Sequence, residues 1–378
     1  MGAATESPPG WELLRLDVFA LVINGKAEQM TTKTLAELAV ICGATLDGDG
    51  ERVVSGPASL SDAGSSHVSF LANSLYGKLL ETTQAAGVIV SLDYESKRED
   101  LTLLRCENPN GAFTAVVEFF AGDQSAVDPG VHASAVIASS AEVHPEARIG
   151  ALVSVGEGAS IGKGATLHPG VIVEKEASVG EGTVLQSGVQ LFRGVSIGAR
   201  CTLGAGTVVG SDGFGFDQSE TGWVKVAQCG TVQIEDDVDV GANSTIDRAR
   251  FGVTRICRGA KLDNMVHVGH NAVVEENAML IAQVGLAGSS RVGEGAILGG
   301  KVGVVGHTTV GAGARVAGGA VVWSDVEPGA DYAGLPARPK TEFLQAMALS
   351  RRLPGLLDRI KALEARIREL EASQEETT

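Results

Sequence analysis

The sequence feature that most restricts the fold is a six-residue repeat between Val131 and Val322. An aliphatic residue occupies every sixth position, and the pattern is interrupted only after Val209 and after Ile246. A fixed short period of this kind is typical of a solenoid, in which each repeat packs on its neighbours. The aliphatic positions are Val131, Ile137, Val143, Ile149, Val155, Ile161, Leu167, Val173, Val179, Leu185, Leu191, Ile197, Leu203, Val209, Ile234, Val240, Ile246, Ile256, Leu262, Val268, Val274, Leu280, Leu286, Val292, Leu298, Val304, Val310, Val316 and Val322.

The small residues between these positions indicate a parallel β-helix. The fourth residue after an aliphatic position is usually Ala or Thr, as at Ala147 and Thr183, and glycines cluster nearby. We interpret each hexad as a short strand and a turn, with the aliphatic residue in a narrow core and glycine in the turn. Three hexads make a triangular coil, so residues eighteen apart stack about 4.8 Å from each other. A disordered glycine-rich segment would not space aliphatic residues so regularly.

The charge and the cysteines restrict partners and compartment. The chain has 378 residues and a formal net charge of −16, which argues against nucleic acid or an anionic membrane surface as partners. Five cysteines without a CxxC motif favour reduced thiols in a cytoplasmic protein over disulfides or a zinc site. No stretch approaches the roughly 20 apolar residues of a membrane helix, and Leu16–Ile23 lacks a cleavage site for a signal peptide.

Changes in the sequence pattern divide the chain into four parts. We expect an N-terminal extension over residues 1–29, a small α/β domain over 30–121, the β-helix over 122–335 and a helical extension over 336–378. In the α/β domain, Thr34 and Glu37 have the spacing of a capping box at a helix start. Residues 87–90 and 101–104 are typical of buried strands. The domain has neither a GxGxxG motif nor a P-loop, so dinucleotide or triphosphate chemistry is not indicated.

Three residues of the α/β domain are candidates for binding a flat base. Phe70, Asn73 and Tyr76 are spaced by three and would share a face if the segment were helical. Two rings could then enclose a base while the amide contacts its edge. Spacing alone also permits the simpler interpretation that Phe70 and Tyr76 are core residues.

The two interruptions of the repeat are candidates for functional segments. The longer lies between Val209 and Ile234 and contains turn glycines and aromatic residues, so it could cover a cleft or contact a neighbouring subunit. The shorter adds four residues before Ile256. Both are expected near the same part of the stack.

His270 is the polar residue with the strongest catalytic pattern. It lies two positions after the inward Val268, at a corner, and Gly288 occupies the same corner of the next coil. A histidine beside a backbone N–H provides a base and an oxyanion donor, which are the minimum for acyl transfer. His307 has a phase that places it near the same groove.

Two other interpretations of these histidines remain open at this point. His267, His270 and His307 could be solvated corner residues. They could also bind zinc, as in trimeric β-helix carbonic anhydrases. Their three different hexad phases argue against convergence on one ion, so we predict no metal.

Several motifs resemble a known family. The repeat is similar to the hexapeptide-repeat acyltransferases, whose β-helix is left-handed. The segments 211–216, 222–226, 241–248 and 262–271 resemble, in that order, the UDP-3-O-acylglucosamine N-acyltransferases of lipid A synthesis. The resemblance extends from about residue 30 to the C-terminus. It implies a mostly β fold, with a left-handed parallel β-helix after a small α/β domain and before a helical tail.

The resemblance also implies roles for individual residues. His270 matches the general base, and Gly288 matches the glycine whose N–H binds the oxyanion. The uridine-binding positions match Phe70, Asn73 and Tyr76, which favours the binding interpretation of these residues. The resemblance also gives substrate-binding roles near the catalytic histidine to His307, Asp263 and Asn264. Val321 lies where a residue limiting the acyl-chain length is expected.

The implied reaction transfers a (3R)-3-hydroxyacyl group from acyl carrier protein to the 2-amino group of UDP-3-O-(3-hydroxyacyl)-glucosamine. The family is homotrimeric, with active sites between neighbouring β-helices, and needs no cofactor apart from the phosphopantetheine of the carrier. A convex corner of a β-helix needs such a neighbour to form a cleft. The extension over residues 1–29 is not part of the family pattern.

The C-terminal tail combines an apolar stripe with basic residues. Its apolar residues alternate by four and three, as in a coiled coil, although one amphipathic helix packed on its own chain fits equally. The basic residues suggest docking of acidic acyl carrier protein, against the alternative of a solvated helix face. The apolar residues are Leu356, Ile360, Leu363, Ile367 and Leu370, and the basic ones are Arg351, Arg352, Arg359, Lys361, Arg366 and Arg368.

Two alternative functions belong to other classes, and a third is another acyltransferase. A structural β-helix scaffold would show no effect of changing His270. A sugar-nucleotide pyrophosphorylase would need a glycine-rich phosphate loop, which the N-terminal domain lacks. The O-acyltransferase of the preceding step shares the β-helix but not an N-terminal domain of this kind.

Overall fold

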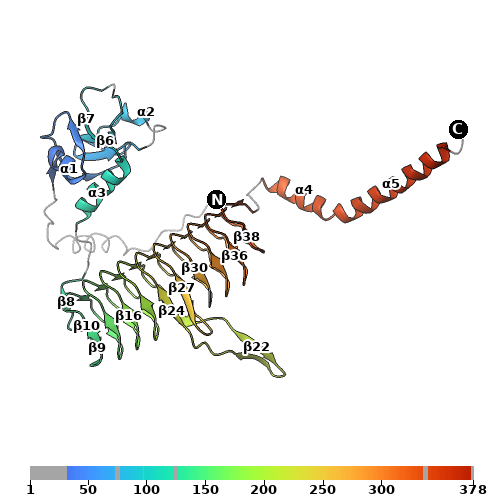
Figure 1. Cartoon of the computed structure of the whole chain (residues 1–378). Coiled ribbons are helices and arrows are strands. Elements are labelled where there is room, and N and C mark those ends of the chain that lie inside the picture. The colour runs from blue at the N-terminus through green and yellow to red at the C-terminus, as the bar shows by residue number, and fades with distance from the viewer. Residues whose placement is uncertain (1–31, 73–76, 97, 123–126, 335–338, 376–378) are drawn as a thin grey trace, which may run out of the picture. The chain divides into compact units, whose positions relative to one another are not determined.

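The computed structural model describes residues 32–72, 77–96, 98–122, 127–334 and 339–375 (Figure 1). The chain divides into two compact units, Met1–Gln124 and Ser125–Thr378. Within the described residues, no helix has the length and apolar character needed to cross a membrane.

The first unit is a five-stranded sheet with helices. Its strands lie in the order β2-β7-β6-β5-β4, and only the β2–β7 pair is antiparallel. A second, two-stranded sheet pairs β1 with β3. The elements are β1 (Lys33–Thr34), α1 (Leu35–Ile41), β2 (Thr45–Asp47), β3 (Val53–Val54), β4 (Gly56–Pro57), β5 (His67–Phe70), α2 (Gly77–Leu80), β6 (Gly87–Ser91), β7 (Thr102–Cys106) and α3 (Pro109–Ala121).

Local sequence explains how this unit is built. Thr34 Oγ1 accepts the N–H of Glu37 at 3.2 Å, and Glu37 Oε2 accepts the N–H of Thr34 at 2.9 Å, so the predicted capping box is confirmed. Strands β6 and β7 confirm the two predicted buried strands. Alternate residues of β6 face opposite sides: Ile89 packs in the cluster that includes α1 and α3, and Val88 packs in the cluster on the other face.

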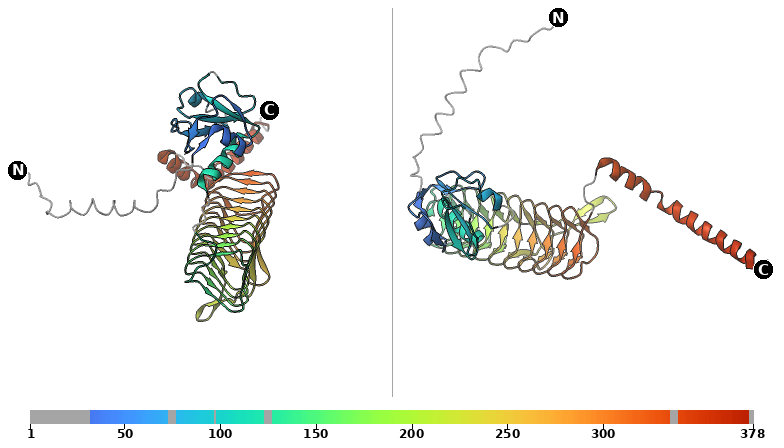
Figure 2. Two further views of the ribbon diagram at one scale, coloured as in Figure 1. Left: turned by 90° about the vertical axis from the view of Figure 1, so that its left-hand side faces the viewer. Right: turned by 90° about the horizontal axis from the view of Figure 1, so that it is seen from above.

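The second unit contains the predicted parallel β-helix (Figures 1 and 2). Its strands form three parallel sheets. Sheet I contains β8 (Gly130–Val131), β11 (Arg148–Ile149), β14 (Thr166–Leu167), β17 (Val184–Leu185), β20 (Thr202–Leu203), β25 (Asp239–Val240), β28 (Lys261–Leu262), β31 (Met279–Leu280), β34 (Ile297–Leu298), β37 (Arg315–Val316) and β39 (Asp331–Tyr332). Sheet II contains β9 (Val136–Ile137), β12 (Ser154–Val155), β15 (Ile172–Val173), β18 (Gln190–Leu191), β21 (Val208–Asp212), β26 (Thr245–Arg248), β29 (His267–Val268), β32 (Gly285–Leu286), β35 (Gly303–Val304) and β38 (Val321–Val322). Sheet III contains β10 (Glu142–Val143), β13 (Ser160–Ile161), β16 (Ser178–Val179), β19 (Ser196–Ile197), β24 (Thr231–Ile234), β27 (Val253–Ile256), β30 (Val273–Val274), β33 (Arg291–Val292) and β36 (Thr309–Val310).

The register confirms the triangular coil of three hexads. Residues eighteen apart pair across neighbouring coils, as Leu167 does with Leu185. The aliphatic residues are buried along most of the stack, and the predicted small residues lie beside them. The hydroxyl of buried Thr183 donates to the carbonyl of Gly198 at 2.8 Å, which satisfies a polar group inside the core. At the first coil Val131 is exposed, because β8 pairs only with β11.

The two interruptions leave the core intact and lie together, as expected. Across the longer one, Ser196 pairs with Gln233, so one coil is extended by a segment that contains the hairpin of β22 (Phe216–Ser219) and β23 (Gly222–Lys225). This hairpin projects from the stack (Figure 1). The shorter interruption contacts the longer one, because the N–H of Cys229 donates to the carbonyl of Arg250 at 2.8 Å.

The C-terminal segment is helical, as the sequence predicts, and it forms two helices. Helix α4 spans Lys340–Ser350 and helix α5 spans Leu353–Glu375. The side chains of Leu356, Ile360 and Leu363 are exposed. An apolar stripe on a helix without a covering partner is typical of a surface that binds another chain.

Candidate active site

A pocket of about 510 Å³ opens on the outer face of sheet II. Its floor follows one column of the sheet, because His267 pairs with Gly285, Gly285 with Gly303, and Gly303 with Val321. Gly285 and Gly303 leave the middle of this column without side chains. The strands therefore form a smooth apolar trough that ends at Val321. The lining residues are Phe214, Asp247, His267, Gly269, His270, Gly285, Leu286, Ala287, Gly288, Gly303, Val304, Val305 and Val321.

His270 is held at the edge of this pocket by two glycines. A Cβ added to Gly288 would lie 2.5 Å from His270 Nε2, and one added to Gly213 would lie 2.6 Å from His270 Cβ. Larger residues at either position would displace the imidazole. Gly213 belongs to the longer interruption, so that segment packs against the histidine and helps to position it.

A hydrogen bond from His270 to Asn271 determines which ring nitrogen of His270 is basic. Asn271 Nδ2 donates to the carbonyl of Phe251 at 2.9 Å, and its Oδ1 accepts the N–H of Arg250 at 3.0 Å, which fixes the orientation of the amide. His270 Nδ1 lies 3.2 Å from the same Oδ1, an acceptor, so Nδ1 carries the proton. The lone pair of the neutral ring is therefore on Nε2, beside Gly288.

The backbone N–H of Gly288 is available to a ligand. It has no hydrogen-bond partner among the residues that the structure describes, whereas the Gly288 carbonyl accepts the N–H of His307 at 3.2 Å. His307 is exposed, has a φ of 62° and does not line the pocket in this single chain. Its backbone thus supports the peptide unit of Gly288.

A second polar pair lines the same pocket. Asp247 is 8% exposed, and its Oδ1 accepts the hydroxyl of Ser211 at 3.0 Å. Its Oδ2 lies 3.8 Å from His267 Nε2, while His267 Nδ1 lies 2.8 Å from Thr245 Oγ1. Burial raises the pKa of the Asp247 carboxyl, and His267, Ser211 and His270 act in the opposite direction.

Asp263 and Asn264 lie at a different corner, between sheets I and II. Asp263 Oδ2 accepts the N–H of Ala282 at 3.0 Å, and Asn264 Oδ1 accepts the N–H of Ala242 at 2.8 Å. In this single chain neither residue lines the pocket of His270. These hydrogen bonds stabilise the corner itself.

The candidate uridine residues are only partly described. Phe70 ends strand β5 and stacks on Phe113 with ring centroids 4.3 Å apart, so it packs against the helix-covered face of the sheet. Asn73 and Tyr76 lie outside the described residues. The spacing of Phe70, Asn73 and Tyr76 suggested that they share a face of a helical turn, whereas Phe70 lies in a strand.

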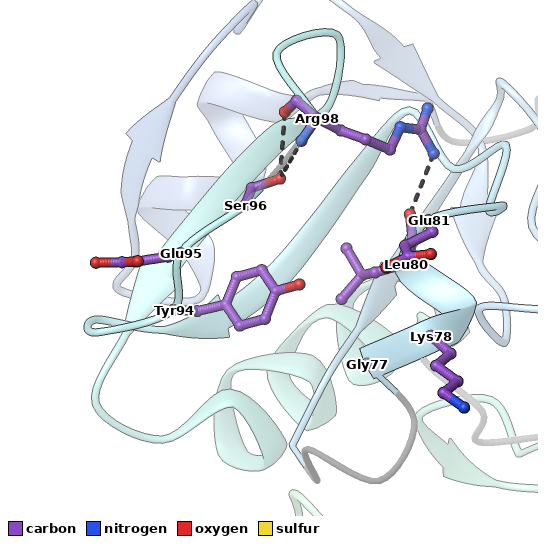
Figure 3. A pocket seen from close by; sticks show the side chains of 8 residues that line it. All are labelled: Gly77, Lys78, Leu80, Glu81, Tyr94, Glu95, Ser96 and Arg98. Atoms are coloured by element: carbon purple, nitrogen blue, oxygen red, sulfur yellow. Dashed lines mark hydrogen bonds between the residues drawn. The ribbon is translucent and has the colours of Figure 1, made fainter.

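A separate pocket of about 290 Å³ lies in the first unit (Figure 3). Tyr94 and Leu80 point toward each other across it, and Arg98 donates to the carbonyls of Leu80 at 3.2 Å and Thr83 at 2.8 Å. Phe70 does not line this pocket.

One group of side chains within the described ranges has metal-ligand spacing, namely Glu235, Cys257 and Glu276. Burial and neighbouring carboxylates raise the pKa of the Cys257 thiol to about 11, so it is a poor source of the thiolate that a metal requires. His267, His270 and His307 do not form such a group. The alternative of a three-histidine zinc site thus receives no support from their positions.

Parts of this chain resemble known families and solved structures. A family model described as UDP-3-O-(3-hydroxymyristoyl) glucosamine N-acyltransferase matches residues 51–119, and one for the hexapeptide repeat of succinyl-transferase matches residues 152–187 and 185–211. A solved UDP-N-acetylglucosamine acyltransferase of Francisella novicida is 23% identical over 58% of this chain and 73% of that chain, with a TM-score of 0.42.

Curated relatives named UDP-3-O-acylglucosamine N-acyltransferase match nearly the whole chain. The protein of Syntrophotalea carbinolica is 50% identical over 89% of this chain and 98% of its own length. Those of Syntrophus aciditrophicus and Methylacidiphilum infernorum are 46% and 44% identical, over 91% and 89% of this chain and 94% and 95% of their own.

Fold and site together define a hexapeptide-repeat acyltransferase, an enzyme with a parallel β-helix and an apolar trough beside a histidine. The chain belongs to the UDP-3-O-acylglucosamine N-acyltransferase family. The predicted resemblance is therefore confirmed.

Sequence reasoning did not select Phe214, Asp247, Asn271, Gly285 or Gly303 as site residues. The two glycines carried a detectable signal, because they precede an inward aliphatic residue in successive coils of one sheet. Asp247 and Asn271 lie in motifs that were recognised, but their hydrogen bonds depend on loop conformations that no repeat pattern specifies.

Proposed function

We propose that this enzyme transfers a (3R)-3-hydroxyacyl group from acyl carrier protein to the 2-amino group of UDP-3-O-(3-hydroxyacyl)-glucosamine, giving UDP-2,3-diacylglucosamine. The observation that carries the proposal is that His270 Nε2 lies beside Gly288, whose N–H has no partner among the described residues, next to an apolar trough. The names of the curated relatives support the acceptor and the N-acyl product. No cofactor is needed apart from the phosphopantetheine that carries the acyl group.

The geometry supports a single-base mechanism. His270 Nε2 removes a proton from the acceptor nitrogen as that nitrogen attacks the thioester carbonyl. The developing oxyanion is bound by the N–H of Gly288, a donor already in place. When the C–S bond breaks, the imidazolium returns the proton to the leaving sulfur. The acyl chain lies in the trough over Gly285 and Gly303.

The N-terminal unit favours N-acylation over the alternative O-acylation. The family model that matches residues 51–119 lies within this unit, and the O-acyltransferases of the preceding step lack such a domain. We propose that Phe70, Asn73 and Tyr76 bind the uridine there. A non-catalytic scaffold would have no use for a histidine whose tautomer is fixed by Asn271.

A homotrimer would complete the site. The pocket of His270 is an open trough on one chain, and a neighbouring β-helix would close it. Asp263, Asn264 and His307, which do not line the pocket of their own chain, would then contact substrate between protomers. We place the enzyme in the cytoplasm, in keeping with its acyl carrier protein donor and its free cysteines.

Product analysis tests the proposal. Purified protein is incubated with UDP-3-O-acylglucosamine and a panel of 3-hydroxyacyl carrier thioesters, and products are identified by mass spectrometry. We expect a gain of one 3-hydroxyacyl group on nitrogen. A product acylated on oxygen, or acylation of UDP-N-acetylglucosamine instead, would favour the O-acyltransferase.

Val321 is expected to limit the acyl chain. Its side chain is 53% exposed at the end of the trough, so a larger residue can be accommodated without disturbing the core. Val321→Trp should shift the preferred donor to shorter chains, because the indole occupies space where the chain ends. Competition among donors of graded length measures the shift. An unchanged preference, with Val136→Trp on an early coil as control, would show that chain length is set elsewhere.

The basic residues of the C-terminal segment are expected to receive acyl carrier protein. Arg351 follows helix α4 and the exposed residues of α5 include Arg359 and Lys361. Reversing the charge at Arg351 and Arg352 to Glu should raise KM for the carrier-bound donor several-fold, because complementary charge accelerates association. KM for the acceptor should not change. If the donor KM is unaffected at low ionic strength, the carrier docks on another surface.

A further inference from the structure

The pocket holds a carboxylate–imidazole pair that the mechanism above does not use. Asp247 Oδ2 and His267 Nε2 are 3.8 Å apart, which is too far for a direct hydrogen bond. Oδ2 has no hydrogen-bond partner within the described parts of the chain, although the residue is only 8% exposed. Both side chains line the pocket. A group bound between them could interact with the carboxylate of Asp247 and with the ring nitrogen Nε2 of His267.

The position of the pair separates it from the acyl trough. Asp247 belongs to β26 and His267 to β29, whereas the glycine floor continues through β32 and β35 toward β38. The acyl chain therefore extends away from Asp247. The polar end of the pocket is left to the acceptor.

The reaction releases one proton more than His270 can return to the sulfur. A sugar amine titrates near neutrality, much as an α-amino group does at about pH 7.7–8.0, so a substantial fraction arrives as ammonium. The ammonium must lose one proton before its lone pair can attack, and the nitrogen loses a second as the amide forms. The thiolate takes back one, and the other must reach solvent.

We propose that Asp247 and His267 form a polar subsite that binds the acceptor amine in its ammonium form and removes the first of these two protons. This inference rests on the proposed function. Asp247 supplies the negative charge, and His267 Nε2 accepts the proton. The side chain of His267 is 49% exposed, so it can pass the proton to water. His270 then takes the second proton, the C–N bond forms, and the C–S bond breaks with protonation of the sulfur.

The environment of the Asp247 carboxylate favours binding of a cation. Burial raises the pKa of this carboxyl, so a cation bound at Oδ2 would stabilise its ionised form. The titratable groups facing it are His267 and His270 near β29, and Asp212 of β21. Asp212 is engaged with Lys225 at 2.5 Å. Ser211 Oγ fixes the other carboxylate oxygen, leaving Oδ2 directed to the pocket.

Binding and turnover as a function of pH test the subsite. Affinity for UDP-3-O-acylglucosamine is measured by calorimetry without donor at about pH 6 and about pH 9, for the wild type, Asp247→Asn and His267→Gln. Asp247→Asn should weaken binding roughly 10- to 100-fold at the lower pH, where the amine is charged, and little at the higher pH. A glucose analogue with a hydroxyl in place of the amine should bind all three proteins equally.

Turnover provides the second readout. In Asp247→Asn and His267→Gln, kcat/KM for the acceptor should fall as the pH drops below the amine pKa, while KM for the donor stays constant. Asp239→Asn, on the outer face of sheet I, is the control. An equal loss at every pH, or an equal loss with the hydroxyl analogue, would overturn the subsite and leave Asp247 a structural role. Failure of the wild type to form any amide would instead refute the proposed function, and the binding comparison would still decide the subsite.

Discussion

Replacement of His270 by alanine is expected to lower kcat roughly 10²- to 10⁴-fold, the usual contribution of a general base. Nε2 of this ring carries the lone pair beside Gly288, and within the pocket-lining set only His267 is another imidazole. KM for both substrates should change little, because the ring acts on the reacting nitrogen. Steady-state release of the carrier thiol measures the effect.

The control for this variant is His144→Ala. His144 is another corner histidine, whose Nδ1 accepts the N–H of Glu146 at 3.1 Å, many coils from the pocket. It should retain wild-type turnover, and both variants should keep the thermal stability of the wild type. A His270→Ala enzyme with more than a tenth of wild-type kcat would exclude this histidine as the base.

Replacement of Gly288 by alanine should reduce kcat by roughly 10²- to 10³-fold, within the range expected for losing a general base, because alanine keeps the N–H but displaces the His270 ring. The backbone tolerates alanine, since Gly288 is not among the residues with positive φ. The added Cβ would lie 2.5 Å from His270 Nε2 and 2.6 Å from Cε1, so the imidazole must leave its position. Gly56→Ala, where a Cβ meets no atom within 4 Å, is the matched control.

A double variant separates displacement of the base from general damage. If Gly288→Ala acts mainly by moving the ring, adding it to His270→Ala should cost much less than it does alone. Independent, fully multiplicative losses would indicate that the two residues act separately. Full activity of Gly288→Ala would contradict the described packing of the imidazole.

The repeat allowed much of this architecture to be predicted. An aliphatic residue at every sixth position specifies the core, and the eighteen-residue register follows from three hexads per coil, as Leu167 and Leu185 illustrate. The same eighteen-residue register predicts that His270 and Gly288 lie at the same corner of neighbouring coils. Thr34 and Glu37 specified a helix start because a capping box is a local interaction.

Other features depend on contacts that periodicity does not encode. The basic nitrogen of His270 is determined by the amide orientation of Asn271, which in turn depends on the four-residue interruption around Phe251. The hydrogen bond from Ser211 to Asp247 depends on the bulge between Val209 and Ser211, which aligns Ser211 with Asp247 in the neighbouring strand. The roles assigned by resemblance to Asp263 and Asn264 stay predictions, because in the single chain these side chains accept hydrogen bonds from backbone N–H groups at their own corner.

The most direct test is a crystal structure of the assembled enzyme with its N-acylated product. Our account predicts that the amide nitrogen lies within hydrogen-bond reach of His270 Nε2, about 2.6–3.2 Å, and that the amide oxygen faces the N–H of Gly288. The new acyl chain should lie over Gly285 and Gly303, in a groove shared with a neighbouring protomer. A product bound away from His270, or a His270 covered by its own chain and remote from any groove between subunits, would contradict the account.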